Sequence, residues 1–405
     1  MNLRTFFPDT KLFLLCLTAT LMGIVAIWDA GYARTDGSAF PREVKYQAVY
    51  VVVAMAVGFA CTRIKPGRWK WLGWIGLAVS VAALCVVEFT PLGYSIGGAQ
   101  RWIKIGSVTI QPSEFIKLAS LMFLSSVMAA HEPWKPPKKA FTNFGQRIDR
   151  LWIPKFRRSF PFLLVVALAI MVERQPDLAT GAVILVTSLV VITVAGVTRR
   201  SLLTLAAIFV VLAGIAIVEQ PYRFERFRVH ADRWSADNRL DGGFQTVVSE
   251  AALARGGVLG VGVGNGTAKQ SLPAPTTDFV LTTVGEEFGL IGVCSVLVVL
   301  GGITLRLLQL AAKANDRFGR LVLSGLATWI GVQTSTSVMM VNGALPPIGI
   351  PLPFISYGGS SLVALWMGIG IAMTMVARKE TDKEVPNAET GSYGWRDRRP
   401  RVSRT

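Results

Sequence analysis

The amino-acid sequence predicts an all-α polytopic membrane protein, and three observations support that prediction. Apolar residues make up 52% of the 405 positions, and the mean hydropathy is +0.47. Several apolar runs approach the ~20 residues that a helix needs to cross a bilayer. The longest polar stretches are about 131–159, 219–277 and the tail after 377. No sizeable soluble domain is therefore expected.

Ten membrane-spanning helices account for the apolar runs. We expect them near residues 11–29, 46–62, 71–89, 113–130, 160–173, 178–196, 201–218, 279–305, 320–341 and 359–377. The fifth is short and ends at Glu173, where Pro176 and neighbouring charges predict a tight turn into the sixth. No cleavage site follows the first run, which is interpreted as a retained span.

Basic residues predict the orientation, because Lys and Arg are retained on the cytoplasmic side. If both termini are cytoplasmic, the basic clusters at 63–70, 135–158 and 313–320 fall inside. The exception is the large extracytoplasmic loop at about 219–278, between helices seven and eight, and long loops follow the charge rule poorly. The basic tail at 379–405 is expected to be disordered and cytoplasmic, and residues 1–378 to form the membrane domain.

Composition also narrows the classes of partner and cofactor. The net charge is +17, but these cations mainly signal topology and attract anionic lipid head groups, so no nucleic-acid partner is expected. The four cysteines fall in apolar runs and are interpreted as small buried residues. With only two histidines, a histidine-based metal centre is not expected, and no metal site is predicted.

Four unusual segments share the outer face under this topology. They are GGAQRWIKIGSVTIQPSEFIKLA (97–119), QPDLATG (175–181), the 219–278 loop and LPPIGIPLPFISYGGSS (345–361). Irregular backbone at membrane depth is tolerated only where protein or a watery cavity surrounds it. The four segments therefore predict a shared external cavity.

The first segment offers two pairs of candidate residues. Arg101 could bind a phosphate and Trp102 could stack on a sugar or a lipid, although a place in the interfacial belt is the commoner role for such a tryptophan. Glu114 and Lys117 lie three residues apart on a helix that Ser113 is expected to cap, so they share a face and can pair. Whether that pair holds helices together or contacts substrate stays open.

Asp278 ends the polar loop, and the eighth helix begins directly after it. A carboxylate there lies at the water boundary beside a helix N-terminus, whose dipole favours the charged form; a simple helix cap is the alternative role. Glu286 and Glu287 follow within the apolar run, where ionisable groups are costly and indicate function. Helical rotation allows only one of the two to face the Asp278 side.

The loop before Asp278 has two further features. Residues 222–228 are basic and aromatic, which suits either contact with lipid head groups or the steering of an anionic pyrophosphate. The glycines of ALARGGVLGVGVGNG indicate a tight, close-packed loop. This is not a nucleotide fingerprint, because no strand precedes it and no lysine stands at the P-loop position.

Together these segments resemble the SEDS family (shape, elongation, division and sporulation), which includes RodA and FtsW. GAQRWIKIGSVTIQPSEFIKLA is similar to the family's motif between helices three and four, TTDFVLTTVGEEFGLIG to its helix-eight motif, and IPLPFISYGGSS to its most diagnostic string. The match covers about 11–378. The sequence departs from the family pattern at Ala179, Ala274, Thr276 and Ser337, which concerns accessory contacts.

The resemblance implies a peptidoglycan glycosyltransferase of the bacterial cytoplasmic membrane, which polymerises lipid II on the outer face and releases undecaprenyl pyrophosphate. It places the family's essential acid on Asp278. The implied substrate-binding residues are Arg101, Trp102, Glu114, Lys117, Gln245, Ser249, Ser356 and Tyr357. It also implies a class B penicillin-binding protein, a transpeptidase, as partner, with a role in either cell elongation or cell division.

Our hypothesis is that Asp278 is the general base that takes the proton from the 4-hydroxyl of the acceptor N-acetylglucosamine. Candidates for stabilising the leaving pyrophosphate are Arg101, Lys117, the arginines of 222–228 or a divalent ion, Mg²⁺ or Mn²⁺. Two alternatives are a lipid II flippase, which intramembrane ionisable groups would suit, and a non-catalytic scaffold for a transpeptidase. Clustering of the unusual residues on one face disfavours transport, since carriers bind near the midplane.

Overall fold

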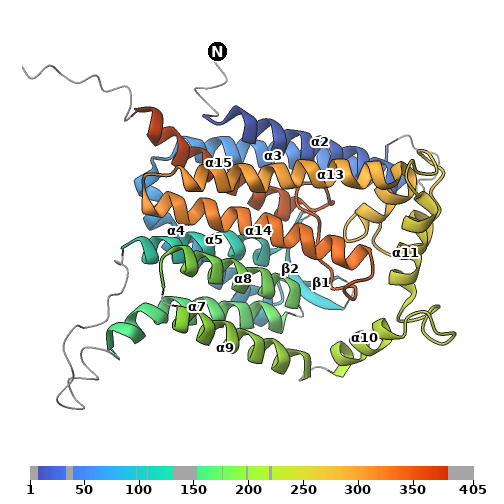
Figure 1. Ribbon diagram of the computed structural model, residues 1–405, viewed down its shortest axis with the longest axis horizontal. Coiled ribbons are helices and arrows are strands. Elements are labelled where there is room, and N and C mark those ends of the chain that lie inside the picture. The colour runs from blue at the N-terminus through green and yellow to red at the C-terminus, as the bar shows by residue number, and fades with distance from the viewer. Residues whose placement is uncertain are drawn as a thin grey trace, which may run out of the picture.

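The computed structural model describes residues 8–32, 40–96, 98–106, 108–130, 153–175, 177–197, 199–218 and 221–381. Within these ranges the chain forms a bundle of long helices that run roughly side by side (Figure 1). A helix occupies each of the ten predicted ranges to within two residues of its predicted ends or beyond them: α2 (Thr10–Tyr32), α3 (Arg42–Thr62), α4 (Pro66–Phe89), α5 (Pro112–Ala130), α7 (Ile153–Arg174), α8 (Leu178–Val194), α9 (Arg199–Val218), α13 (Val280–Ala312), α14 (Arg317–Val341) and α15 (Gly359–Thr381). From residue 382 onward, the predicted tail lies outside the described residues.

Several of these helices have the length and composition of membrane spans. Among the described residues, six qualify: α2, α3, α4, α5, α13 and α15 up to Val376. Helix α8 is apolar but has only 17 residues, a little short of the ~20 that cross a bilayer. A mostly helical chain with several spanning helices is thus confirmed, whereas the count of ten spans stays a prediction.

The prediction of an all-α fold is wrong at one place. Residues 93–110 form an antiparallel sheet of three strands, β1 (Gly93–Ile96), β2 (Ala99–Ile105) and β3 (Val108–Ile110), in the order β1-β2-β3. At the first turn Ile96 pairs with Ala99 and Gly98 has a φ of +81°, which glycine adopts without strain. Short runs of β-branched and aromatic residues between glycine turns favour strands, and this stretch is too polar to register as an apolar run.

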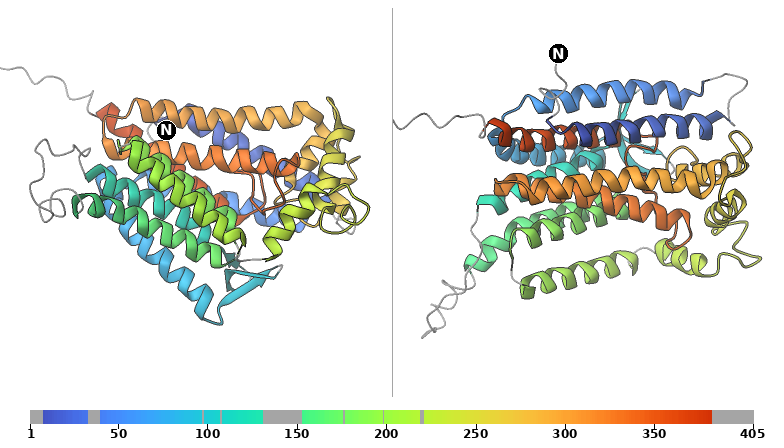
Figure 2. Two further views of the ribbon diagram at one scale, coloured as in Figure 1. Left: turned by 60° about the horizontal axis from the view of Figure 1, so that its bottom comes forward. Right: turned by 45° about the horizontal axis from the view of Figure 1, so that its top comes forward.

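Three shorter helices fill the loop between α9 and α13: α10 (Pro221–Ala231), α11 (Phe244–Gly256) and α12 (Ala268–Ser271). Helices α10 and α11 lie at one end of the bundle, on the right in Figure 1. The sheet lies on the same half of the bundle, and the two views of Figure 2 agree with this placement. That end therefore collects the irregular segments.

Helix α13 is broken where the sequence predicts one continuous helix. Gly289 has a φ of +66° and a ψ of −161°, so a short helical segment precedes it and a long apolar one follows. The glycine-rich loop packs directly on this break. A Cβ on Gly289 would lie 2.4 Å from the backbone nitrogen of Gly260, and a Cβ on Gly260 would lie 2.1 Å from the carbonyl oxygen of Glu287. Only glycine fits at both positions.

Helix α14 contributes much of the core and leads into the irregular segment before α15. Phe318, Leu321 and Trp329 of α14 are buried. Helix α15 packs closely on α3, where a Cβ on Gly370 would lie 2.1 Å from the carbonyl oxygen of Gly58. The 345–358 segment therefore connects two helices that are each packed into the bundle.

Candidate functional site

Asp278 is half-buried and stands two residues before α13. The chain just before it is fixed by the 351–358 segment. The hydroxyl of Ser356 donates to the carbonyl oxygen of Thr277 at 2.6 Å, and the backbone N–H of Tyr357 donates to that of Thr276 at 2.9 Å. Two adjacent residues of one loop thus hold the two peptides that precede Asp278.

These bonds define what Ser356 and Tyr357 do in this structure. The Ser356 hydroxyl also accepts a hydrogen bond from the backbone N–H of Leu352 at 2.8 Å, so both its donor and an acceptor site are committed within the protein. The ring of Tyr357 lies against that of Tyr50 on α3, with 6.3 Å between ring centroids. These contacts let both residues position the chain that carries the carboxylate, and a substrate contact for them stays a prediction.

Charged groups from two other segments act on Asp278. Burial raises the pKa of its carboxyl to about 6, Arg101 on β2 acts to lower it, and Asp177 before α8 acts to raise it. Gly349, with a φ of +71°, lies against the carboxylate: a Cβ there would be 3.6 Å from Oδ2. Three of the predicted segments, 97–119, 175–181 and 345–361, therefore meet at Asp278 as expected.

The Asp278 carboxylate receives no hydrogen bond from the part of the chain that the structure describes; burial and the two charges alone set its pKa. A carboxylate that is partly desolvated and has a pKa near 6 is ionised at neutral pH, yet it is a better proton acceptor than an ordinary aspartate. The carboxylate is therefore suited to accept a proton from a hydroxyl group, as a general base does.

Asp177 is a site residue that the sequence analysis did not single out. It caps α8 by accepting from the backbone N–H of Thr180 at 3.2 Å, and its other oxygen accepts from the hydroxyl of Ser113 at 3.2 Å. Nearby, the Nε of Arg101 donates to the carbonyl oxygen of Gln175 at 2.8 Å. The Asp-Leu-Ala-Thr run before an apolar stretch is a helix-start signal that could have identified this residue.

Arg101 and Trp102 are neighbours on β2, at a place where the register against β1 shifts: Ser95 pairs with Gln100 and Tyr94 with Trp102, which leaves Arg101 as the extra residue of a bulge. The charge of Arg101 reaches Asp278. Trp102 is paired with Tyr94 of β1. A substrate contact for Arg101 and for Trp102 stays a prediction.

Glu114 and Lys117 form the predicted ion pair, but they are enclosed in the bundle. The Lys117 Nζ lies 2.9 Å from both carboxylate oxygens of Glu114. It also donates to the Oε1 of Gln333 at 3.2 Å and lies 5.2 Å from the ring centroid of Trp329. Gln333 in turn donates to the carbonyl oxygen of Pro351 at 2.7 Å. This geometry favours the structural alternative and links the pair to the segment that clamps Asp278.

Gln245 and Ser249 lie on α11. Ser249 is fully buried, and its hydroxyl is 2.6 Å from the Thr282 hydroxyl and donates to the carbonyl oxygen of Val341 at 2.7 Å. It therefore joins α11 to α13 and α14. Gln245 is half-buried one helical turn earlier. No contact brings either residue to Asp278 within the described ranges.

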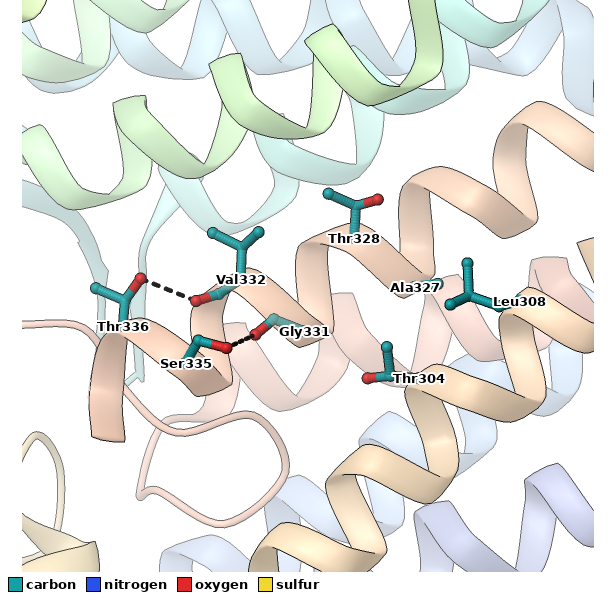
Figure 3. A pocket seen from close by; sticks show the side chains of 8 residues that line it. All are labelled: Thr304, Leu308, Ala327, Thr328, Gly331, Val332, Ser335 and Thr336. Carbon is teal, nitrogen blue, oxygen red and sulfur yellow. Dashed lines mark hydrogen bonds between the residues drawn. The ribbon is translucent and has the colours of Figure 1, made fainter. Parts of the chain in front are cut away.

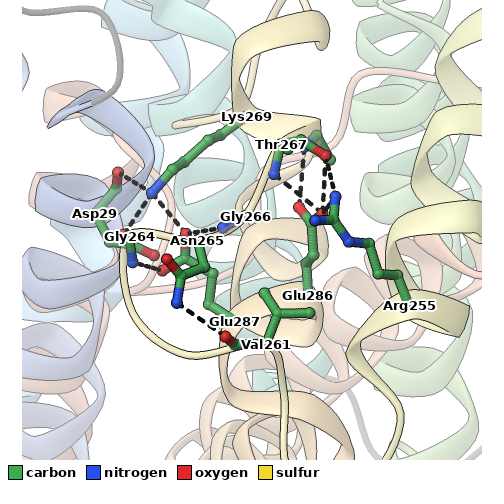
Figure 4. A network of polar contacts seen from close by, with 11 residues as sticks. Asp29, Arg255, Val261, Gly264, Asn265, Gly266, Thr267, Lys269, Glu286 and Glu287 are labelled. Carbon is green, nitrogen blue, oxygen red and sulfur yellow. Dashed lines mark hydrogen bonds and ion pairs between the residues drawn. The ribbon is translucent and has the colours of Figure 1, made fainter.

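Glu286 and Glu287 are both occupied by the glycine-rich loop, so the expectation that one faces Asp278 is wrong (Figure 4). Glu286 accepts from the backbone N–H groups of Thr267 and Ala268 at 3.0 and 2.9 Å. Glu287 lies 2.6 Å from the Nζ of Lys269, which also reaches Asp29 of α2 at 2.8 Å. Asp278 precedes α13, which begins at Val280, so a helical wheel drawn through Asp278 does not give the directions of the two glutamates.

Two grooves lie apart from these groups. One, of about 310 Å³, runs between α13 and α14, where the side chains of Thr304, Thr328 and Val332 are among those that line it (Figure 3). Another, of about 350 Å³, lies beside the sheet at Leu92 and Lys104. Neither Asp278 nor Arg101 lines these two grooves. Across the described ranges, no three His, Cys, Asp or Glu side chains gather into a metal-binding group.

Comparisons with known proteins agree with the resemblance seen in the sequence. A family model for FtsW, RodA and SpoVE, described as "Cell cycle protein", matches residues 9–381. Stage V sporulation protein E of Bacillus subtilis is 30% identical over 379 residues, which cover 91% of this chain and 96% of that one. A "Probable peptidoglycan glycosyltransferase FtsW" of Geobacter metallireducens is 30% identical over 377 residues, covering 91% and 95%.

Solved structures share the fold. One described as "Structural coordination of polymerization and crosslinking by a peptidoglycan synthase complex" has a chain with a TM-score of 0.73 and 27% identity, covering 92% of this chain and 98% of that one. The crystal structure of Thermus thermophilus rod shape determining protein RodA has a TM-score of 0.64 at 24% identity, covering 91% and 96%. At that identity the second likeness concerns the fold alone.

Proposed function

This chain belongs to the family of FtsW, RodA and SpoVE cell cycle proteins, and on that premise we propose that it is a peptidoglycan glycosyltransferase of the bacterial membrane. Relatives named as probable peptidoglycan glycosyltransferases support this activity. The single observation that carries the proposal is Asp278: hydrogen bonds hold the backbone before it, and the pKa of its carboxyl is raised to about 6.

The proposed reaction extends a glycan strand from lipid II. The 4-hydroxyl oxygen of the acceptor sugar bonds to the anomeric carbon of the donor, while the bond from that carbon to the pyrophosphate breaks. The hydroxyl proton passes to Asp278, and undecaprenyl pyrophosphate leaves with the bonding electron pair. Removing the proton as the new bond forms is the work of a general base.

Arg101 is the cation best placed to serve the leaving pyrophosphate. Its charge already reaches Asp278, and cations aimed at developing negative charge stabilise the transition state. Lys117 is less suited to this role because Glu114 and Gln333 engage its ammonium group inside the bundle. A divalent ion, Mg²⁺ or Mn²⁺, would supply further positive charge; whether one is used stays a proposal.

Arg226 joins the 222–228 stretch to the site. Its guanidinium donates to the carbonyl oxygen of Pro347 at 2.8 Å, just before the 351–358 segment that fixes the chain at Asp278. This basic stretch therefore supports the site from the solvent side. Its other arginines keep the proposed role of attracting an anionic substrate, since Arg228 pairs only loosely with Glu225 at 3.8 Å.

The location of the reaction completes the proposal. We place Asp278 on the extracytoplasmic face of the cytoplasmic membrane, with ten spans and both termini cytoplasmic, because the basic residues between helices favour that orientation. A class B penicillin-binding protein is the proposed partner; the related solved structure described as a peptidoglycan synthase complex supports such a pairing for its own chain. Elongation and division remain equal candidates for the setting.

One reconstitution tests the activity against its alternatives. The full chain is purified, placed in liposomes with fluorescent lipid II, and followed for polymer formation and for transfer of lipid II between leaflets. We expect polymer and no transfer. Transfer without polymer would support a flippase, and the absence of both, with transpeptidase binding retained, would support a scaffold; either result contradicts the proposed function.

A further inference from the structure

The glycine-rich loop carries an uncharged stretch that neither the fold nor the proposed reaction explains. The thirteen residues 256–268 contain no charged side chain, although Arg255 and Lys269 flank them. Val258, Leu259 and Val263 within it are 61%, 78% and 54% exposed. Exposed aliphatic side chains that gather in one patch mark a surface for an apolar partner or a membrane, and within the described residues nothing covers them.

The loop lies against the start of the long segment of α13. The backbone N–H groups of Leu290 and Ile291 donate to the carbonyl oxygens of Gly257 and Val258 at 2.9 and 3.3 Å. Leu290 and Ile291 are themselves 55% and 57% exposed. We refer to the exposed aliphatic residues together as the apolar tip: Val258, Leu259, Val263, Leu290 and Ile291.

The depth of the apolar tip follows from the length of the spanning segment. Residues 288–305 form an uncharged run of 18 residues between Glu287 and Arg306. As a helix this run is about 27 Å long, close to the ~30 Å of the hydrocarbon core. Leu290 therefore lies a few ångströms inside that core, and the loop atoms bonded to it lie at the same depth.

The backbone of the loop is equipped for an apolar surrounding. The first N–H groups after a helix break lack partners within their own helix, and here the loop carbonyls accept from them. In return, the N–H groups of Val261 and Gly262 donate to the carbonyl oxygens of Glu286 and Glu287 at 3.0 and 3.1 Å. Irregular backbone can enter a membrane only when its polar groups are satisfied in this way.

A buried polar cluster on the side of the glycine-rich loop opposite the apolar tip holds the loop in place. The Glu287 carboxylate accepts from the backbone N–H groups of Gly264 and Gly266 at 2.7 and 3.0 Å, while Lys269 bridges Glu287 and Asp29. Figure 4 shows these side chains converging on the loop. The loop is thus pinned to α2 and α13 through its polar side.

We propose that the apolar tip inserts into the lipid bilayer and anchors the extramembranous segment before Asp278 to the membrane surface. The occupant is lipid because the tip continues the lipid-facing surface of a spanning helix at the depth of its first turn. Such insertion reaches the boundary between head groups and acyl chains. The proposal holds whichever face of the membrane the loop occupies, and it does not depend on the catalytic role of Asp278.

Fluorescence quenching tests the insertion directly. In a chain whose four cysteines are replaced by alanine, single cysteines are placed by Leu259→Cys or Val263→Cys and labelled with the environment-sensitive dye NBD. Val298→Cys, 73% exposed in the spanning segment, is the lipid control, and Asp241→Cys in the exposed part of the loop is the water control. The purified chain is placed in liposomes with or without a nitroxide-bearing phospholipid.

We expect the labels at 259 and 263 to show blue-shifted emission and several-fold stronger nitroxide quenching than the label at 241, approaching the values at 298. Labels at 259 and 263 that behave like the one at 241 would overturn the proposal, as would shielding that appears only when a partner protein is added. If the cysteine-free chain does not fold, a diazirine-bearing phospholipid with the unaltered chain decides: cross-links in 258–264 but not in 232–241 are expected, and the reverse contradicts insertion.

Discussion

Ser356 donates a 2.6 Å hydrogen bond to the carbonyl oxygen of Thr277, the residue directly before Asp278. The same hydroxyl accepts from the N–H of Leu352 at 2.8 Å. One buried side chain thus shapes its own loop and fixes the peptide that carries the proposed base. Within PFISYGGSS, the Ser356 hydroxyl bonds to the backbone next to the proposed base, and a side chain without a hydroxyl could not make these bonds.

Replacing Ser356 with alanine should therefore slow polymerisation without weakening lipid II binding. The change leaves the Thr277 carbonyl and the Leu352 N–H without their partner, which costs about 1–3 kcal/mol of folding free energy. Misplacing a catalytic group by about 1 Å lowers rates by up to ~100-fold. Steady-state kinetics should show a fall in kcat with KM unchanged, whereas Ser335→Ala, on the exposed side of α14, should change neither. A raised KM alone would indicate a substrate contact instead.

The rate of polymerisation should rise with pH through the titration of Asp278. Its pKa is raised to about 6, and only the ionised carboxylate can accept a proton. The profile should thus climb below pH 6 and level off above 7. Arg101 acts to lower this pKa, so Arg101→Gln should move the midpoint to higher pH. A midpoint that does not move would show that the charge of Arg101 does not act on Asp278.

The stability of the folded chain should fall as the pH rises through the titration of Asp278, whereas the rate of polymerisation rises. The pKa of Asp278 is about 6 in the folded chain against an ordinary value of 3.8, so the folded state binds the proton more tightly. The free energy of unfolding therefore decreases between about pH 4 and 6 as the carboxyl ionises, and it stays at the lower value above pH 6. Asp278→Asn should raise the thermal midpoint at pH 8 and leave it nearly unchanged at pH 4. The exposed Asp241→Asn is the control, and equal effects at both pH values would argue against a buried charge.

The Glu114–Lys117 pair should matter far more to stability than an exposed pair of the same spacing. Removing one partner by Glu114→Gln or Lys117→Met leaves a buried charge alone, which costs about 3–5 kcal/mol. In the exposed Glu225–Arg228 pair, with side chains 57% and 76% exposed, the same changes should cost about 0–1 kcal/mol. Thermal unfolding of the single and double variants in detergent measures this. Equal costs for the two pairs would contradict the enclosed geometry.

Sequence reasoning located the helices because each is an apolar run of sufficient length, and it located Asp278 because a charge there ends a polar loop. It also grouped the three other irregular segments with the end of the 219–278 loop, where Asp278 stands. The shared surroundings of Asp278 confirm that grouping: Arg101, Asp177 and Gly349 come from three of those segments.

Other features depended on contacts that a linear pattern does not reveal. Glu286 and Glu287 bind the glycine-rich loop, which packs on the break at Gly289, and a helical wheel does not show which loop packs on a helix. Gln333 looks like any polar residue of an amphipathic helix, yet its side chain joins Lys117 to the Pro351 carbonyl. The sheet at 93–110 was missed because its strands are too short for a search based on apolar length.

The most direct test of the central claim is the initial rate of glycan polymerisation by purified Asp278→Asn with lipid II as substrate, beside the unaltered chain and Asp241→Asn. The substitution keeps the shape of the side chain and removes its basicity. We predict a fall of about 10²–10⁴-fold with lipid II binding unchanged. An Asp278→Asn protein that polymerises at the unaltered rate would show that another group takes the proton.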